Sequence, residues 1–187
     1  MPSLRIDREA SLLLVVDIQR RLAPHVADGE AIIRRGAALL TAASWFGVPR
    51  LVTEHCPDRI GRTVEPLRAC LGADETFEKT SFAATGHPAF LERVQRSGRR
   101  RVVMTGMEAH VCVLQTALGL RACGHEVCVV TDAVGSRADR HDDRTHALHR
   151  LAQAGCLLAG TETVLFEWTA TADDAHFREV LALVKAL

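Results

Sequence analysis

The pattern of apolar and polar positions along the chain predicts a parallel sheet covered by helices. Four apolar runs have the length and continuity of strands buried on both faces, and they span residues 11–17, 49–54, 100–106 and 125–133. Segments with the 3.6-residue period of helices follow or separate them, at residues 28–47, 87–97, 111–123, 141–155 and 173–186. Strands that alternate with helices favour parallel pairing, with helices on both faces of the sheet. Residues 75–79 and 156–160 are candidates for two further short strands.

Length and composition narrow the class of protein. The 187 residues are predicted to form a single domain, spanning positions 1–187. Basic and acidic residues balance, at 23 each, so no net field attracts nucleic acid or an anionic membrane. The chain has no Tyr and few other aromatic residues, which further disfavours base stacking. The expected partners are therefore small molecules or other proteins, and neither nucleic acid nor membrane.

The distribution of apolar residues and cysteines also bears on location. The apolar run at 12–18 is short and is interrupted by Asp17, so it is typical of a strand and not of a signal peptide. No apolar segment approaches the roughly 18 to 20 residues needed to cross a bilayer. The six cysteines show no CxxC spacing and no paired Cys/His pattern, as expected for reduced thiols. We expect a soluble, cytoplasmic protein.

Several polar residues follow directly after expected strands. In open parallel sheets, ligands bind beyond the carboxyl ends of the strands, near the point where the strand order reverses. Asp17, Glu54, Lys79 and the segment 108–112 all fall at such ends. The sequence therefore predicts a functional site along one edge of the sheet.

Three of these side chains carry reactive chemistry, and each has a simpler interpretation. Cys112 falls in the first turn of the expected helix 111–123, where the helix dipole favours a thiolate with a pKa well below about 8.5. It is equally typical of a small buried core residue. Asp17 suits a helix N-cap or a general base. Lys79 suits a solvated surface or a cation that holds a thiolate and a carboxylate in their anionic forms.

A set of motifs across the chain identifies a family. The segments LLLVVDIQ, TEHCP, FEKTSFAA, GMEAHVCVLQTALGL, VVTDAVGSR and TETVLFEW occur in an order that resembles the isochorismatase-like cysteine hydrolases. The likeness is greatest to the isochorismatase domain-containing branch of that family. It implies an α/β, three-layer Rossmann-like fold with a six-stranded parallel sheet flanked by helices.

The resemblance also implies a catalytic apparatus. By motif position, the triad of the family falls on Asp17, Lys79 and Cys112. A cis peptide is implied between Met107 and Glu108, which would aim the Glu108 N–H beside that of Cys112 to form an oxyanion hole.

Two departures from related patterns narrow the chemistry. Isochorismatases proper, which cleave a vinyl ether, are similar but lack this cysteine, so Cys112 favours acyl chemistry. Nicotinamidases carry an Asp/His metal cluster after the second strand, whereas the corresponding TEHCPDRIGRT contains His55 as its only histidine. One histidine beside Glu54 falls short of the three or four ligands of a typical site. We therefore expect no metal and no cofactor.

The predicted activity is hydrolysis of a small amide or related C–N bond through a thioester. Asp17 would accept the thiol proton of Cys112 and later activate water, while Lys79 maintains the charge balance. Four further residues are expected in the wall of the substrate pocket, namely Gln19, Glu54, Phe82 and His110. The alternatives are a catalytically idle oligomeric scaffold of the same fold and, with less support, a vinyl-ether hydrolase.

The C-terminal third contains a dense apolar cluster. Val164, Leu165, Phe166 and Trp168 place four large apolar side chains within five residues. One helical face buries only part of such a cluster, which predicts an exposed apolar patch and a symmetric homo-oligomer. The alternative is that the C-terminal helix covers the cluster within one subunit.

Overall fold

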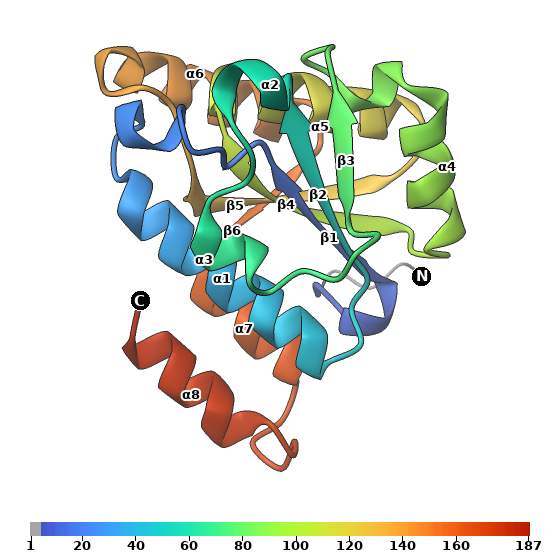
Figure 1. Cartoon of the computed structure of the whole chain (residues 1–187). Coiled ribbons are helices and arrows are strands. Elements are labelled where there is room, and N and C mark those ends of the chain that lie inside the picture. The colour runs from blue at the N-terminus through green and yellow to red at the C-terminus, as the bar shows by residue number, and fades with distance from the viewer. Residues whose placement is uncertain (1–4) are drawn as a thin grey trace.

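A computed structural model describes residues 5–187, and its centre is a six-stranded sheet (Figure 1). All neighbouring strands pair in parallel, in the order β3-β2-β1-β4-β5-β6. The strands are β1 (Ser11–Val16), β2 (Arg50–His55), β3 (Thr76–Lys79), β4 (Arg101–Met107), β5 (Glu126–Gly135) and β6 (Leu157–Ala159). The expected three-layer α/β fold is therefore confirmed, including both short strands.

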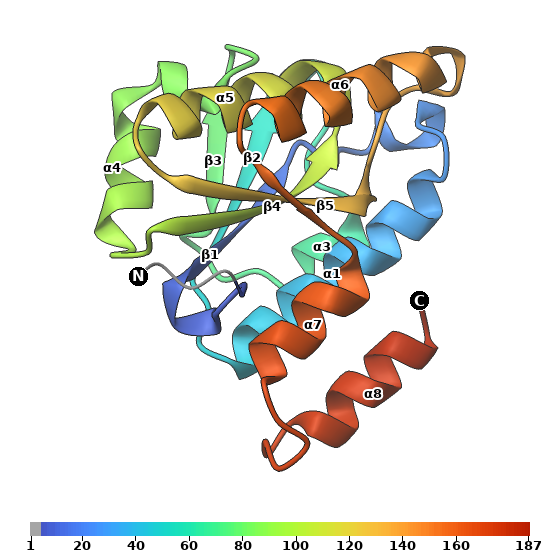
Figure 2. The same cartoon turned by 180° about the vertical axis from the view of Figure 1, so that it is seen from behind.

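Helices cover both faces of this sheet (Figures 1 and 2). One face carries α1 (Gly29–Trp45) and α7 (Thr161–Thr169), with α8 (Phe177–Lys185) as an outer layer. The other face carries α4 (Pro88–Arg96), α5 (Leu114–Ala122) and α6 (His141–Gln153). Two four-residue helices, α2 (Pro57–Ile60) and α3 (Glu65–Arg68), were not predicted because they are too short to show a helical period.

Among the described residues, no helix has the length and apolar character required to span a membrane.

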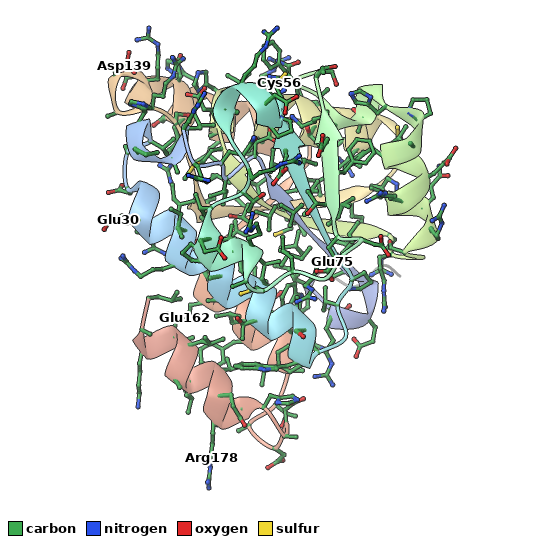
Figure 3. All side chains as sticks on the ribbon, in the orientation of Figure 1. Glu30, Cys56, Glu75, Asp139, Glu162 and Arg178 are labelled. Atoms are coloured by element: carbon green, nitrogen blue, oxygen red, sulfur yellow. The ribbon has the colours of Figure 1, made fainter. Side chains whose placement is uncertain are left out.

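The central strand β1 explains why its sequence is apolar without interruption. All six of its residues are buried. Leu13 and Val15 pack into the core beneath α1 and α7, whereas Leu12 and Leu14 pack into the core beneath α4, α5 and α6. Charged side chains such as Glu30, Asp139 and Arg178 lie at the periphery (Figure 3).

Three of the four large apolar side chains of α7 are buried and only Phe166 is partly exposed, so the predicted exposed patch does not form. Val164, Leu165 and Trp168 have no exposed surface, and the Trp168 indole N–H donates to Ser11 Oγ at 3.3 Å. The helix presents apolar groups to two partners, since α1 and the sheet lie on one side and α8, through Val180, lies on the other. The C-terminal helix thus covers the cluster within one subunit.

The strand order places a topological switch between β1 and β4. From this central pair, the chain continues outward to β2 and β3 on one side and to β5 and β6 on the other. At Gly106, whose φ is 144°, a Cβ atom would lie 2.2 Å from the carbonyl oxygen of Val16 on β1, so this position favours glycine. Such a switch point is where open α/β sheets bind ligands.

Candidate active site

Asp17 is the first residue after β1 and lies at the switch point. Its backbone is left-handed, with φ of 52°, a strained conformation that Asp tolerates better than most residues. The side chain is 1% exposed. Thr53 Oγ1 donates to Oδ1 at 2.6 Å, and Lys79 Nζ donates to Oδ2 at 2.6 Å. Asp17 is therefore not a helix cap but a buried carboxylate with a donor on each oxygen.

Lys79 ends β3 and is buried too, so the interpretation as a solvated surface lysine is wrong. The exposed fraction of its side chain is 0%. Besides Asp17, its ammonium group donates to the carbonyl oxygens of Ser81 at 3.2 Å and Phe82 at 3.3 Å. The carboxylate neutralises the charge, and the two carbonyls satisfy the remaining donors.

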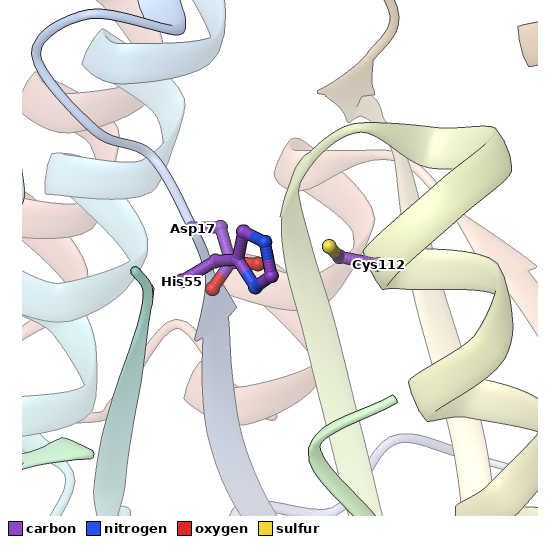
Figure 4. Close-up of side chains that lie close together, drawn as sticks. All are labelled: Asp17, His55 and Cys112. Carbon is purple, nitrogen blue, oxygen red and sulfur yellow. The ribbon is translucent and has the colours of Figure 1, made fainter. Parts of the chain in front are cut away.

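Cys112 faces this ion pair from the other side of the switch. It lies in a π-helical turn, Ala109–Val113, that precedes α5, so the regular helix begins three residues later than expected. Its Sγ points toward Asp17 and His55 (Figure 4). A carboxylate oxygen of Asp17, a ring nitrogen of His55 and the Cys112 sulfur all lie within 4.8 Å of one another. Short π-helical segments of this kind are frequent at functional sites.

The pKa of the Cys112 thiol is raised, whereas the sequence had predicted a lowered one. Burial raises the pKa of Cys112 above its ordinary value, the charge of Asp17 raises it further, and the charge of Lys79 only partly opposes them. Because the side chain is 7% exposed, desolvation of a thiolate outweighs the favourable helix terminus. This direction favours the protonated thiol over the thiolate.

His55 is a site residue that the sequence did not reveal. Strand β2 runs one residue further than expected, so His55 ends it at the same sheet edge as Asp17. Its ring stacks on Phe82, with centroids 5.3 Å apart, and Phe82 is 51% exposed. Burial lowers the pKa of His55, and the charge of Lys79 lowers it further, which favours the neutral ring. The strand-end position was the available signal, but the residue had been weighed only as a metal ligand.

Gln19 and Glu54, both expected in the pocket wall, make hydrogen bonds to the segment around the end of β2. The Gln19 side chain is fully buried, and its amide accepts from the His55 N–H at 2.7 Å and donates to the His55 carbonyl at 3.0 Å. Glu54 accepts from the backbone N–H and the hydroxyl of Thr63, both at 2.7 Å, and pairs with Arg62. Burial alone would raise the pKa of Glu54, but these donors outweigh it and lower the pKa. Both residues therefore hold the segment that follows β2 in place.

Glu108 and His110 lie in the segment between β4 and Cys112. The Met107–Glu108 peptide is cis, as the family resemblance implied. The Glu108 carboxylate accepts from Arg137 Nε at 2.8 Å, and the side chain is 13% exposed. His110 Nδ1 lies 2.8 Å from Ser136 Oγ, so this half-buried ring is fixed by a neighbouring loop.

Asp17, His55 and Cys112 are residue types that bind metals, and their donor atoms converge. The Lys79 ammonium lies 2.6 Å from the same carboxylate and would repel a cation placed between the three. Both carboxylate oxygens also already accept hydrogen bonds. This donor set therefore does not fit a resident metal ion.

Comparison with known proteins agrees with this geometry. The isochorismatase domain matches residues 11–163, which include the ends of all six strands and every residue of the site described above. The chain belongs to the isochorismatase family. Within that family, it is 35% identical over 175 residues to isochorismatase domain-containing protein 1 of Danio rerio, covering 94% of this chain and 61% of the relative. It is 34% identical to isochorismatase domain-containing protein 2A of Mus musculus, covering 97% of this chain and 85% of that protein.

Solved structures of isochorismatase-family proteins share the fold. The MAR1 ribonuclease structure from Caenorhabditis elegans is 35% identical with a TM-score of 0.89, covering 97% of this chain and 92% of the other. The YcaC gene product of Escherichia coli, described as an octameric hydrolase of unknown specificity, is 24% identical with a TM-score of 0.87, covering 100% and 97%. The chain spans about three fifths of the length of the Danio rerio protein and of its Salmo salar counterpart.

Proposed function

We propose that the protein is a cysteine hydrolase that cleaves a small amide or related C–N bond through a thioester. The observation that carries the proposal is a buried thiol whose sulfur lies within 4.8 Å of a carboxylate, which is itself paired with a buried lysine. A nucleophile beside a base that a third group orients is the general arrangement of covalent hydrolases. An isochorismatase-family fold is compatible with this chemistry.

In the proposed acylation step, Asp17 accepts the proton of the Cys112 thiol as the sulfur attacks the substrate carbonyl. The raised pKa of the thiol makes this transfer necessary, because little thiolate exists before substrate binds. The C–N bond then breaks as Asp17 returns the proton to the leaving amine. Water hydrolyses the resulting thioester.

Two further groups would stabilise this reaction. The backbone N–H groups of Glu108 and Cys112 form the proposed oxyanion hole, which would hold the charge that develops on the carbonyl oxygen. Lys79 donates to Asp17 at 2.6 Å and would balance the charge of the site during the reaction. Phe82 and His110 are the proposed contacts of the substrate, since one is exposed and the other half-buried near the site.

The competing functions are less well supported. A scaffold protein has no need to bury an ion pair beside a thiol, and a vinyl-ether hydrolase has no need of Cys112. A similar solved structure carries the name ribonuclease, but the balanced charge of this chain gives no general attraction for a polyanion. We propose a small-molecule substrate, a cytoplasmic location and, given the octameric YcaC protein, a homo-oligomer.

The proposal is tested by ammonia release from a panel of small primary amides, imides and carbamates. Activity on at least one compound is expected, with loss of 10³-fold or more in Cys112→Ala, an estimate based on removal of a covalent nucleophile. Cys123→Ala is the matched control, because Cys123 is exposed and outside the site. Dialysis against a chelator should leave the rate unchanged. Equal activity of Cys112→Ala and the wild type would refute the assignment.

A further inference from the structure

We infer that His55 is a second catalytic residue, which accepts the proton of the water that hydrolyses the thioester. This inference rests on the proposed function and divides its two half-reactions between two bases. Asp17 serves the thiol in acylation, and His55 serves the water in deacylation.

The position of the ring supports this role. A ring nitrogen of His55 lies within 4.8 Å of both the Cys112 sulfur and an Asp17 oxygen. At such a separation, one water molecule bridges a base and an acyl group carried on the sulfur. Within residues 5–187, the buried Nδ1 of His55 has no hydrogen-bond partner. A buried polar atom without a partner is uncommon and calls for an explanation, and a reacting water is one.

Asp17 is less suited to the second step. Each of its oxygens already accepts a bond of 2.6 Å, one from Thr53 and one from Lys79. These two bonds occupy acceptor positions on both oxygens, so Asp17 has less capacity to hold a water in addition to its contact with the thiol. His55, in contrast, has one ring nitrogen, Nδ1, without a hydrogen-bond partner among residues 5–187, and this atom can accept a proton.

The backbone and ring of His55 are both held in place. The Gln19 side chain bonds both the N–H and the carbonyl of His55, and it also donates to the carbonyl oxygen of Gly61 at 2.5 Å. Phe82 stacks on the imidazole at an interplanar angle of 29°. A catalytic group fixed in this way loses little entropy when it acts.

The charges around His55 suit a base that is neutral near pH 7. The groups that face it are Lys79 on β3, Asp17 after β1, the backbone of Ser81, Arg59 on α2 and the thiol of Cys112. Burial lowers the pKa of His55, the cations Lys79 and Arg59 lower it further, and Asp17 partly opposes them. The deacylation rate should therefore fall as the pH drops through a value below the ordinary 6.5.

In the proposed deacylation, one proton moves from water to His55 and then to the Cys112 sulfur. The thioester carbonyl forms a bond to the water oxygen while one water proton passes to His55, which becomes an imidazolium. The tetrahedral intermediate then breaks its C–S bond, and the departing sulfur takes the proton from His55. The products are a carboxylic acid, the Cys112 thiol and a neutral imidazole, so no further reactant is required.

The experiment uses p-nitrophenyl acetate as an acylating probe, because its burst and steady-state phases separate the two half-reactions. The wild type should show a burst of p-nitrophenolate followed by a slower steady state. His55→Gln should keep the burst rate and amplitude but lower the steady-state rate by about 10²-fold or more. Acetylated Cys112 should then accumulate, as seen by mass spectrometry. His149→Gln, the same change on the exposed surface of α6, is the matched control.

This experiment separates a failure of the proposed cysteine hydrolase from a failure of the proposed role of His55. If the burst persists in Cys112→Ala, the proposed cysteine hydrolase fails. If the burst requires Cys112 but His55→Gln deacylates at the wild-type rate, only the role of His55 is overturned. An equal loss in both phases would also overturn it, since it would indicate a base for the thiol or a structural defect. Should His55→Gln unfold, the pH dependence of the wild-type deacylation rate decides, and a rate that stays constant from pH 8 down to the onset of acid unfolding overturns the inference.

Discussion

Asp17 and Lys79 form an ion pair whose side chains are 1% and 0% exposed. Removal of one member of such a pair leaves an uncompensated buried charge, which typically costs about 3–5 kcal/mol. Lys79→Met should lower the free energy of unfolding by that amount in urea titrations. Adding Asp17→Asn to Lys79→Met should recover part of the loss, because no lone charge remains.

A matched control for this pair lies on the surface. Glu65 and Arg68 are also paired, but their side chains are 74% and 56% exposed. Exposed pairs contribute about 0–1 kcal/mol, so Arg68→Met should have little effect. A similar loss in Arg68→Met and Lys79→Met would contradict the distinction between the buried and the exposed pair.

The buried environment of Cys112 should slow the alkylation of its thiol. Because burial raises its pKa, Cys112 should react with iodoacetamide more slowly at pH 7 than the exposed Cys123. The same shift affects stability: the contribution of Cys112 is fully present below the pKa of the unfolded thiol and is lost as the pH rises above it. Site-resolved mass spectrometry over a pH series measures the labelling rates. Faster reaction of Cys112 than of Cys123 at neutral pH would show a preformed thiolate.

At the scale of elements, the close approach of β1 and β4 depends on one glycine. A Cβ at Gly106 would lie 2.2 Å from the Val16 oxygen, and both atoms belong to paired backbones that cannot easily move. Gly106→Ala should lower the free energy of unfolding by about 1–3 kcal/mol, because the clash adds to the strain of a side chain at positive φ. Gly36→Ala in α1 is the control: its Cβ would meet Leu67 at an ordinary 3.5 Å, and Ala favours a helix by up to about 1 kcal/mol.

The sequence predicted elements where burial alone decides them. The strands were identified because continuous burial on both faces requires uninterrupted apolar runs, as in β1. Asp17 and Lys79 were placed correctly because strand ends share one edge of a parallel sheet. The π-helical turn at Cys112 and the support role of Gln19 depend on contacts with distant segments, which no local pattern encodes. His55 was missed for a related reason, since its role depends on one extra residue of strand pairing.

At the scale of the whole molecule, the burial of α7 changes how assembly is tested. We expect light scattering to give a mass of at least twice 20.4 kDa, and a monodisperse monomer at micromolar concentration would refute the proposed oligomer. Trp168 has no exposed surface, so Trp168→Glu should unfold the subunit and not merely dissociate it. Circular dichroism distinguishes unfolding from dissociation. A Trp168→Glu variant that is folded but monomeric would indicate that this segment lies at a subunit interface.

The strand order has a consequence for how the chain acquires activity as it folds. The site draws Asp17 and Cys112 from the two strands that meet at the switch, and their positions are 95 residues apart in the sequence. Pairing between such distant segments closes a long loop, which is slow compared with the formation of local helices. During refolding from denaturant, helical signal should therefore return before hydrolysis does. The rate at which activity returns would therefore report the rate at which β1 pairs with β4.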